Sequence, residues 1–407
     1  MKSALTPFVV ILGLFLSLNS QAQSPKFEVN VSSFTDTLIG RVGEIDRDVI
    51  GNLFVADFGE KVWKISPLGE VEVFTNTMYG SSGNALDAQG NLFQAQYYGN
   101  TIVKVNRYTR EVSEVAHKGL VGPVGLAFLN NELYVCNCNN NTIAKVEKTG
   151  EVTQVASGPL FNCPNGLIAG RDGNLYVVNY RNPNIVKVDA AGTATLFAKL
   201  PATSGGHITE LKGNFFVTSF FDHKIFKVSG DGKVTHFAGT GVAGVKNGKG
   251  LESQFINPNG IVATNGSLFV NDKIPGPGGQ GWRTVIRRIS FPDFSAVISR
   301  ALASGGLKQV ETVYKAYKES SFFKNDRTEG EMNFLAYGQL TSGQHDIAIG
   351  LFKLNADSYP ESFNTWDSLA EGYLTKGDKK NARKYYKKSL ELNPQNTNAA
   401  EKLKELQ

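Results

Sequence analysis

The feature that most constrains the fold is a short phrase that recurs six times along the chain. Each copy joins a turn residue to a Leu or Phe, an aromatic residue and, in most copies, a Val. The central positions of the copies are Leu53, Leu92, Leu133, Leu175, Phe215 and Leu268, with spacings of 39, 41, 42, 40 and 53 residues. Self-similarity at such a period is typical of arrays in which every repeat is one small structural unit.

Each phrase continues in the same way, which predicts three or four short strands per repeat. A polar turn is followed by an alternating strand such as Val62-Trp63-Lys64-Ile65, then by a glycine-led turn and another strand. A sheet of this size can bury its faces only against neighbouring sheets. The sequence therefore predicts a mainly β fold, a six-bladed β-propeller over residues 27–291. We expect the alternating stretch from Phe27 to Phe34 to supply the outer strand of the sixth blade and so to close the ring.

After Pro292 the pattern changes to helical spacing, which predicts a second, α-helical domain over residues 295–407. Its key positions occur twice, 34 residues apart: Met332, Leu335, Gly343, Ala348, Phe352 and Pro360, and then Trp366, Leu369, Gly377, Ala382, Tyr386 and Pro394. This pattern resembles the tetratricopeptide repeat. The resemblance implies a surface for a partner protein or peptide, and a packing or spacer module stays open as the alternative.

The N-terminus has the composition of an export signal. Lys2 precedes an apolar stretch from Phe8 to Leu16, and Ser20-Gln21-Ala22 has the form of a cleavage site. We therefore exclude residues 1–22 from the fold and expect a periplasmic or secreted protein with no transmembrane segment in the mature chain. The net charge of +5 is spread over 407 residues without a basic run, so we expect no nucleic-acid partner.

The three cysteines, Cys136, Cys138 and Cys163, do not determine their own pairing. Cys136 and Cys138 lie two apart in a predicted strand, where their side chains share a face but are poorly placed for a mutual disulfide. Cys163 paired with either of them, and three free thiols, remain equal alternatives.

Polar residues recur where a propeller would bring them to one mouth. The loops that lead into the innermost strands carry Glu44, Asn84, Asn165, His207 and Asn259, and the turns after the second strands begin with Asp57, Gln96, Asn137, Asn179, Ser219 and Asp272. Carboxylate and amide oxygens suit a hard cation such as Ca²⁺. The same residue types also satisfy turn amides, and this structural alternative stays open.

Two family resemblances add to this interpretation. The junction from Gly239-Thr240-Gly241 to Pro258-Asn259-Gly260 resembles that of NHL-repeat propellers, over about residues 40–290. Gly43-Glu44 and Pro164-Asn165-Gly166-Leu167 resemble the metal-ligand motifs of the senescence marker protein and gluconolactonase group, which implies a calcium or zinc site with Glu44 and Asn165 as ligands. Where that family has an aspartate that is both ligand and base, this chain has His207.

Two functions follow from these observations. In the first, the mouth binds a small molecule, with Asn84, Asn137, Asn179, Asn259 and Asp272 toward the ligand, and the helical domain binds a protein. In the second, the chain is a metal-dependent lactonase for a sugar lactone or related ester, with Glu44, Asn165 and His207 on the metal and His207 as the catalytic base. Whether the protein is an enzyme is left open by the sequence.

Overall fold

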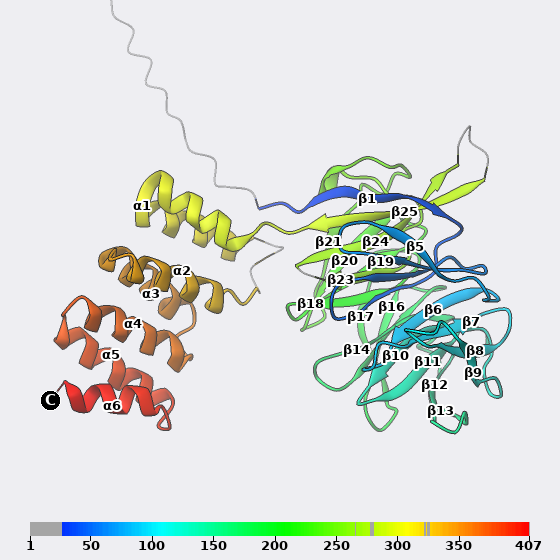
Figure 1. The fold of residues 1–407 in the computed structure, drawn as a ribbon, viewed down its shortest axis with the longest axis horizontal. Coiled ribbons are helices and arrows are strands. Elements are labelled where there is room, and N and C mark those ends of the chain that lie inside the picture. The colour runs from blue at the N-terminus through cyan, green and yellow to red at the C-terminus, as the bar shows by residue number, and fades with distance from the viewer. Residues whose placement is uncertain (1–26, 265, 277–280, 321–322, 324–325, 407) are drawn as a thin grey trace, which may run out of the picture.

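The computed structural model describes residues 27–264, 266–276, 281–320, 323 and 326–406. The predicted export signal lies outside these residues and stays a prediction. Within them, six antiparallel sheets are followed by six α-helices. Figure 1 shows the sheets gathered in one body and the helices stacked beside it.

Five of the sheets are blades in which four strands stand in the order of the chain. Blade 1 holds β2 (Ile45–Arg47), β3 (Leu53–Ala56), β4 (Val62–Ile65) and β5 (Val71–Thr75). Blade 2 holds β6 (Ser81–Leu86), β7 (Leu92–Gln96), β8 (Thr101–Val105) and β9 (Val112–Ala116). Blade 3 holds β10 (Pro123–Leu129), β11 (Glu132–Asn137), β12 (Thr142–Val146) and β13 (Val152–Ser157). Blade 4 holds β14 (Pro164–Ala169), β15 (Leu175–Asn179), β16 (Asn184–Val188) and β17 (Ala194–Lys199). Blade 5 holds β18 (Ile208–Leu211), β19 (Asn214–Ser219), β20 (Lys224–Ser229) and β21 (Val234–Ala238).

The sixth blade is built from both ends of the propeller sequence. Its strands are β23 (Ile261–Thr264), β24 (Ser267–Pro275), β25 (Trp282–Ser290), β1 (Asn30–Ile39) and the two-residue β22 (Gly248–Lys249), in that order from the inside. β1 pairs with β25, Val31 standing opposite Ile289. This confirms that the N-terminal segment closes the ring, with the strand beginning at Asn30.

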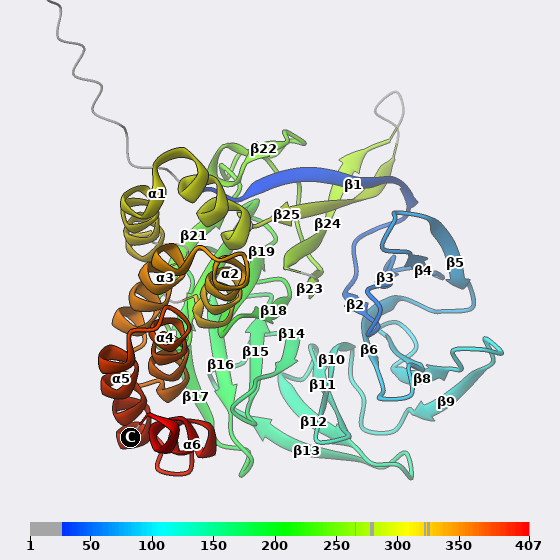
Figure 2. The same ribbon diagram turned by 60° about the vertical axis from the view of Figure 1, so that its left-hand side comes forward.

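A separate apolar core lies between each pair of neighbouring blades. Between blades 1 and 2, Phe54 and Phe74 pack with Leu92 and Val103, and equivalent clusters join the other pairs. The alternating strands present one row of side chains to each neighbour, so every sheet is buried on both faces only within the ring. Figure 2 shows the innermost strands β6, β10, β14, β18 and β23 around the middle of this ring.

The helices form two hairpins between a leading and a final helix. α1 (Phe294–Glu319) departs from helical geometry at Gly305 and Gly306. It is followed by α2 (Glu329–Thr341), α3 (His345–Ser358), α4 (Phe363–Thr375), α5 (Lys379–Leu392) and α6 (Thr397–Glu405). The two predicted repeats coincide with the α2–α3 and α4–α5 pairs, and Asn396 caps α6 by accepting a hydrogen bond from Ala399 N–H.

The helical domain packs on the propeller rather than hanging from it. One continuous apolar cluster runs from blades 5 and 6 into α1, α2, α3 and α4. Phe291, just after β25, contacts Phe216 and Phe237 with ring centroids 5.7 and 5.6 Å apart. Among the described residues, no helix combines the length and apolar character needed to cross a membrane.

Candidate ligand site at the propeller mouth

Six glycines bring the innermost strands into backbone contact. One lies just before each strand or at its third residue: Gly43, Gly83, Gly125, Gly166, Gly206 and Gly260. A Cβ atom at Gly83 would lie 1.8 Å from the Val124 carbonyl oxygen, and one at Gly125 would lie 2.1 Å from that of Asn165. Because any side chain would clash there, only glycine allows the blades to approach so closely. The Glu44 N–H donates across the first junction to the Ser82 carbonyl at 3.0 Å.

A pocket of about 340 Å³ opens at the mouth beside this glycine ring. Four residues that directly precede the glycines line it: Val42, Val124, Asn165 and Asn259. Asn165 Nδ2 donates to the Gly206 carbonyl at 2.9 Å, and Asn259 Nδ2 donates to the Val42 carbonyl at the same distance. The amide groups therefore hold neighbouring blades together as well as lining the pocket.

Every blade also contributes one residue from the mouth-side end of its second strand. In blades 2 to 5 this residue directly follows the strand, in blade 1 it lies two residues after β3, and in blade 6 it lies within β24. These six residues are Phe58, Tyr97, Cys138, Tyr180, Phe220 and Lys273. Phe58 contacts Tyr97, and Tyr180 contacts Phe220, each with ring centroids 5.6 Å apart. The wall of the pocket is thus mainly aromatic, and the same repeat position supplies it around the whole ring.

The polar residues that directly precede these six in the sequence do not line the pocket. Asn137 Oδ1 accepts a hydrogen bond from Val121 N–H, Asn179 Oδ1 from Asn162 N–H and Asp272 Oδ1 from Ile256 N–H, at 3.1, 2.9 and 2.6 Å. Successive strand residues face opposite sides, so these side chains anchor the loops of their own blades. Asn137, Asn179 and Asp272 do not line the pocket, and their predicted contact with a ligand stays a prediction.

The aromatic and basic lining residues were not singled out from the sequence. They are Arg41, Phe58, Tyr97, Tyr180, Arg181, Phe220, Lys273 and Trp282. Most of them directly follow, in the sequence, the polar residues at which the repeated turns begin. Phe58 follows Asp57, for example, and Tyr180 follows Asn179. In each of these pairs the polar residue does not line the pocket, whereas the residue after it does.

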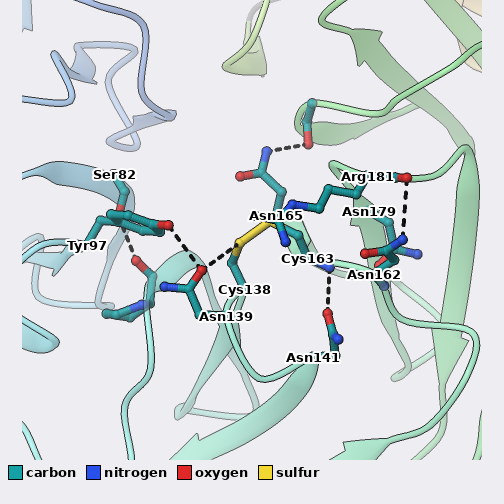
Figure 3. The surroundings of a disulfide bond; sticks show 12 residues. Ser82, Tyr97, Cys138, Asn139, Asn141, Asn162, Cys163, Asn165, Asn179 and Arg181 are labelled. Carbon is teal, nitrogen blue, oxygen red and sulfur yellow. Dashed lines mark hydrogen bonds between the residues drawn. A yellow bond between two sulfur atoms is a disulfide. The ribbon is translucent and has the colours of Figure 1, made fainter.

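A disulfide braces the pocket between blades 3 and 4. Cys138, after β11, is bonded to Cys163, before β14, while Cys136 is a free, buried thiol. This confirms the alternative in which Cys163 takes part. Figure 3 shows the bridge among polar side chains, with the Cys163 N–H donating to Asn141 Oδ1 at 2.7 Å.

Glu44, Asn84 and His207 form a second, more deeply buried group. Glu44 Oε1 lies 3.1 Å from His207 Nδ1, at ion-pair distance but without the alignment of a hydrogen bond. Glu44 Oε2 accepts a hydrogen bond from Asn84 N–H at 3.2 Å. Burial raises the pKa of Glu44, and the neighbouring His207 opposes this shift.

The predicted metal ligands do not form a ready cation site. Both oxygens of Glu44 already have contacts, and Asn165 lines the pocket whereas Glu44 and His207 do not. The described residues contain no group of three His, Cys, Asp or Glu side chains that could hold a metal. One observation points the other way, since Asn84 Oδ1 and Asn259 Oδ1 are buried without a hydrogen-bond partner in the described structure. Metal binding stays a prediction.

Known proteins resemble the two halves of the chain separately. Residues 363–396 match the tetratricopeptide repeat family. The human Superkiller complex protein 3 is 39% identical over 56 residues, which is 14% of this chain and only 4% of that protein.

The propeller resembles solved structures at low sequence identity. A Bacteroides thetaiotaomicron protein of unknown function is 17% identical with a TM-score of 0.55, over 65% of this chain and 76% of its own. An auxiliary nutrient binding protein from Bacteroides ovatus is 14% identical with a TM-score of 0.54, over 66% and 78%. A Xanthomonas campestris gluconolactonase is 15% identical with a TM-score of 0.51, over 65% and 90%. This chain is a six-bladed β-propeller with a tetratricopeptide-type domain. At these identities the likeness establishes the fold alone.

The tetratricopeptide-type domain has one strongly basic helix. α5 exposes six basic side chains: Lys379, Lys380, Arg383, Lys384, Lys387 and Lys388. Of these, Lys388 has a carboxylate partner in Glu391 at 3.3 Å. The exposed side of this helix therefore carries a local excess of positive charge.

Proposed function

We propose that this is an exported binding protein whose propeller mouth holds a small organic molecule. The observation that carries the proposal is the pocket of about 340 Å³, to which all six blades contribute the same repeat position. Ligand sites are typically concave and mainly apolar with a few placed polar groups, and the aromatic wall with Asn165 and Asn259 has this character. The Cys138–Cys163 disulfide supports export, since such bonds persist in oxidising compartments.

The test of mouth binding uses a neutral fluorescent probe, N-phenyl-1-naphthylamine, titrated into the mature protein. Val124 lines the pocket and Val112 lies on the outer strand β9, so Val124→Phe narrows the pocket while Val112→Phe adds the same atoms far from it. We expect Val124→Phe to weaken probe binding about tenfold, a loss of roughly 1.4 kcal/mol. Equal affinity in both variants and the wild type would show that the probe does not bind at the mouth, and the proposal would fail.

We further propose that the helical domain binds an acidic partner protein. Tetratricopeptide-type arrays bind partners on extended surfaces, and the exposed basic side chains of α5 favour a negative one. The test first binds partner proteins to the immobilised protein and releases them with high salt, which screens charge interactions. A photo-crosslinker at Lys384 should capture the same acidic protein that the salt releases, while one at Lys148 on the propeller should not. Capture from both positions to the same extent would contradict this assignment.

A metal-dependent lactonase is the second candidate, favoured by the buried amide oxygens of Asn84 and Asn259 that lack partners among the described residues. Glu44, Asn165 and His207 are the residues predicted to bind the ion. Calorimetric titration of Ca²⁺ and Zn²⁺ into the wild type, Glu44→Gln and the exposed control Glu132→Gln tests it. Binding lost only in Glu44→Gln, with turnover of aldonolactones, would support the enzyme. Absence of binding heat with both ions would contradict the lactonase proposal.

A further inference from the structure

We propose that the mouth pocket selects a small organic anion with a flat apolar body. The inference rests on the proposed function and deepens it by naming the class of ligand. Three lining residues are formally charged, Arg41, Arg181 and Lys273, all three are cations, and no Asp or Glu lines the pocket.

These cations have no acidic partners in the part of the chain that the structure describes. None of the three takes part in an ion pair there. Some lysines elsewhere on the propeller do have such partners: Lys145 pairs with Glu132 at 2.6 Å, and Lys187 pairs with Asp172 at 2.8 Å. What distinguishes the mouth is that three such cations line one concave surface, with no carboxylate among its lining residues.

The cations also act on one another. Burial, and then the positive charge of Arg41, lower the pKa of Lys273. Lys273 Nζ lies 3.9 Å from the centre of the Trp282 ring, which holds it at the pocket through a cation–π contact. Like charges gathered at one concave surface raise the local positive potential, and an anionic ligand group would relieve their repulsion. Guanidinium groups favour carboxylate, phosphate and related oxyanions because they offer paired donors.

The rest of the wall specifies the body of the ligand. Phe58, Tyr97, Tyr180 and Phe220 present aromatic surface from four different blades. Aromatic faces and edges favour flat apolar groups. A neutral sugar lactone would use neither the cations nor most of this surface, so the pocket composition favours an aromatic or similarly flat oxyanion.

Two dyes that share one body isolate the contribution of charge. 8-Anilinonaphthalene-1-sulfonate differs from N-phenyl-1-naphthylamine by its sulfonate group, and both become fluorescent when bound. We expect the wild type to bind the sulfonate at least about tenfold more tightly, since hydrogen bonds to charged groups contribute about this much. Added NaCl should weaken binding of the sulfonate and leave that of the neutral dye nearly unchanged.

Single substitutions then locate the effect. Arg181→Gln and Lys273→Gln should each reduce the preference for the sulfonate several-fold, with binding of the neutral dye retained. The matched control is Lys148→Gln, an exposed lysine between β12 and β13, at the end of β12 away from the mouth-side turn. It should leave the preference unchanged.

The outcomes separate the two proposals. Equal affinities for the two dyes, with no effect of Arg181→Gln or Lys273→Gln, would overturn the anion assignment while mouth binding stood. A preference reduced equally by Lys148→Gln would also overturn it, because the charge effect would not belong to the pocket. If Val124→Phe weakened neither dye, mouth binding itself would fail.

Discussion

Oε1 of Glu44 lies 3.1 Å from Nδ1 of His207, and the two side chains are nearly inaccessible to solvent. Glu44 precedes the inner strand of blade 1 and His207 that of blade 5, so the contact joins two blades that are not neighbours. An imidazole can be neutral, so loss of the carboxylate charge need not leave an unpaired buried charge. We therefore expect the stability of the fold to be more sensitive to the loss of the polar atoms of this pair than to the loss of its charge.

Substitutions at Glu44 test this expectation. Glu44→Gln keeps an oxygen for Asn84 N–H and a polar neighbour for His207, and we expect it to change the free energy of unfolding by less than about 1 kcal/mol. Glu44→Leu removes both and should cost about 2–3 kcal/mol. Urea unfolding at neutral pH measures both values. Equal losses in the two variants would mean that the charge itself stabilises the fold.

Asp46 should make stability depend on pH. Burial raises its pKa from 3.8 to about 6, although Arg47 N–H and Leu86 N–H donate hydrogen bonds to it. The folded protein therefore binds this proton more tightly than the unfolded chain does. The resulting stabilisation is present below about pH 4 and is lost as the pH rises through about 6. It amounts to at most about 3 kcal/mol.

The measurement is urea unfolding of the wild type and Asp46→Asn from pH 4 to 7. The wild type should lose stability with rising pH more steeply than the variant, because the variant has no carboxyl group at position 46 that could release a proton. Glu44, whose pKa burial also raises, is present in both proteins and adds a pH dependence of its own to each, and in the wild type its charge also helps to raise the pKa of Asp46. Parallel curves would contradict the assignment to Asp46.

Removal of the Cys138–Cys163 disulfide should destabilise the propeller. The bond closes a loop with a sequence separation of 25 residues, for which chain entropy predicts roughly 3 kcal/mol. Cys138→Ser/Cys163→Ser should therefore unfold at a lower temperature than the wild type. Reductant should lower the melting temperature of the wild type and leave the double variant unchanged. A response of the double variant to reductant would place the effect elsewhere.

The glycine ring predicts a severe effect of one added methyl group. In Gly83→Ala the new Cβ would lie 1.8 Å from the Val124 carbonyl oxygen, and backbone cannot move aside as a flexible side chain can. We expect a loss of about 3 kcal/mol or more in the free energy of unfolding. Gly330→Ala, in α2 with nothing close to the new atom, should instead gain up to about 1 kcal/mol. Similar values for both would argue against blade contact at Gly83.

The sequence by itself determined the number of blades, the closing strand and the two helical hairpins. These depend on local periodicity: the phrase around Leu53 and its copies recurs because each blade is the same unit, and Met332 and Trp366 begin equivalent helical repeats. The glycines at the beginning of the innermost strands are visible in the sequence too, but their contacts with the next blade are not.

Only the tertiary structure decided which side chains form the site. In a strand, neighbouring residues face opposite ways, so a shift of one position separates Asn179, which anchors a loop, from Tyr180, which lines the pocket. Likewise, the repeat register already places Glu44 and His207 at one mouth, but nothing in the sequence indicates that Lys273 and Arg41 influence each other. Closure of the ring brings such residues together. Contacts among the inner strands depend on how six separate sheets pack around one axis, and no local sequence pattern encodes that packing.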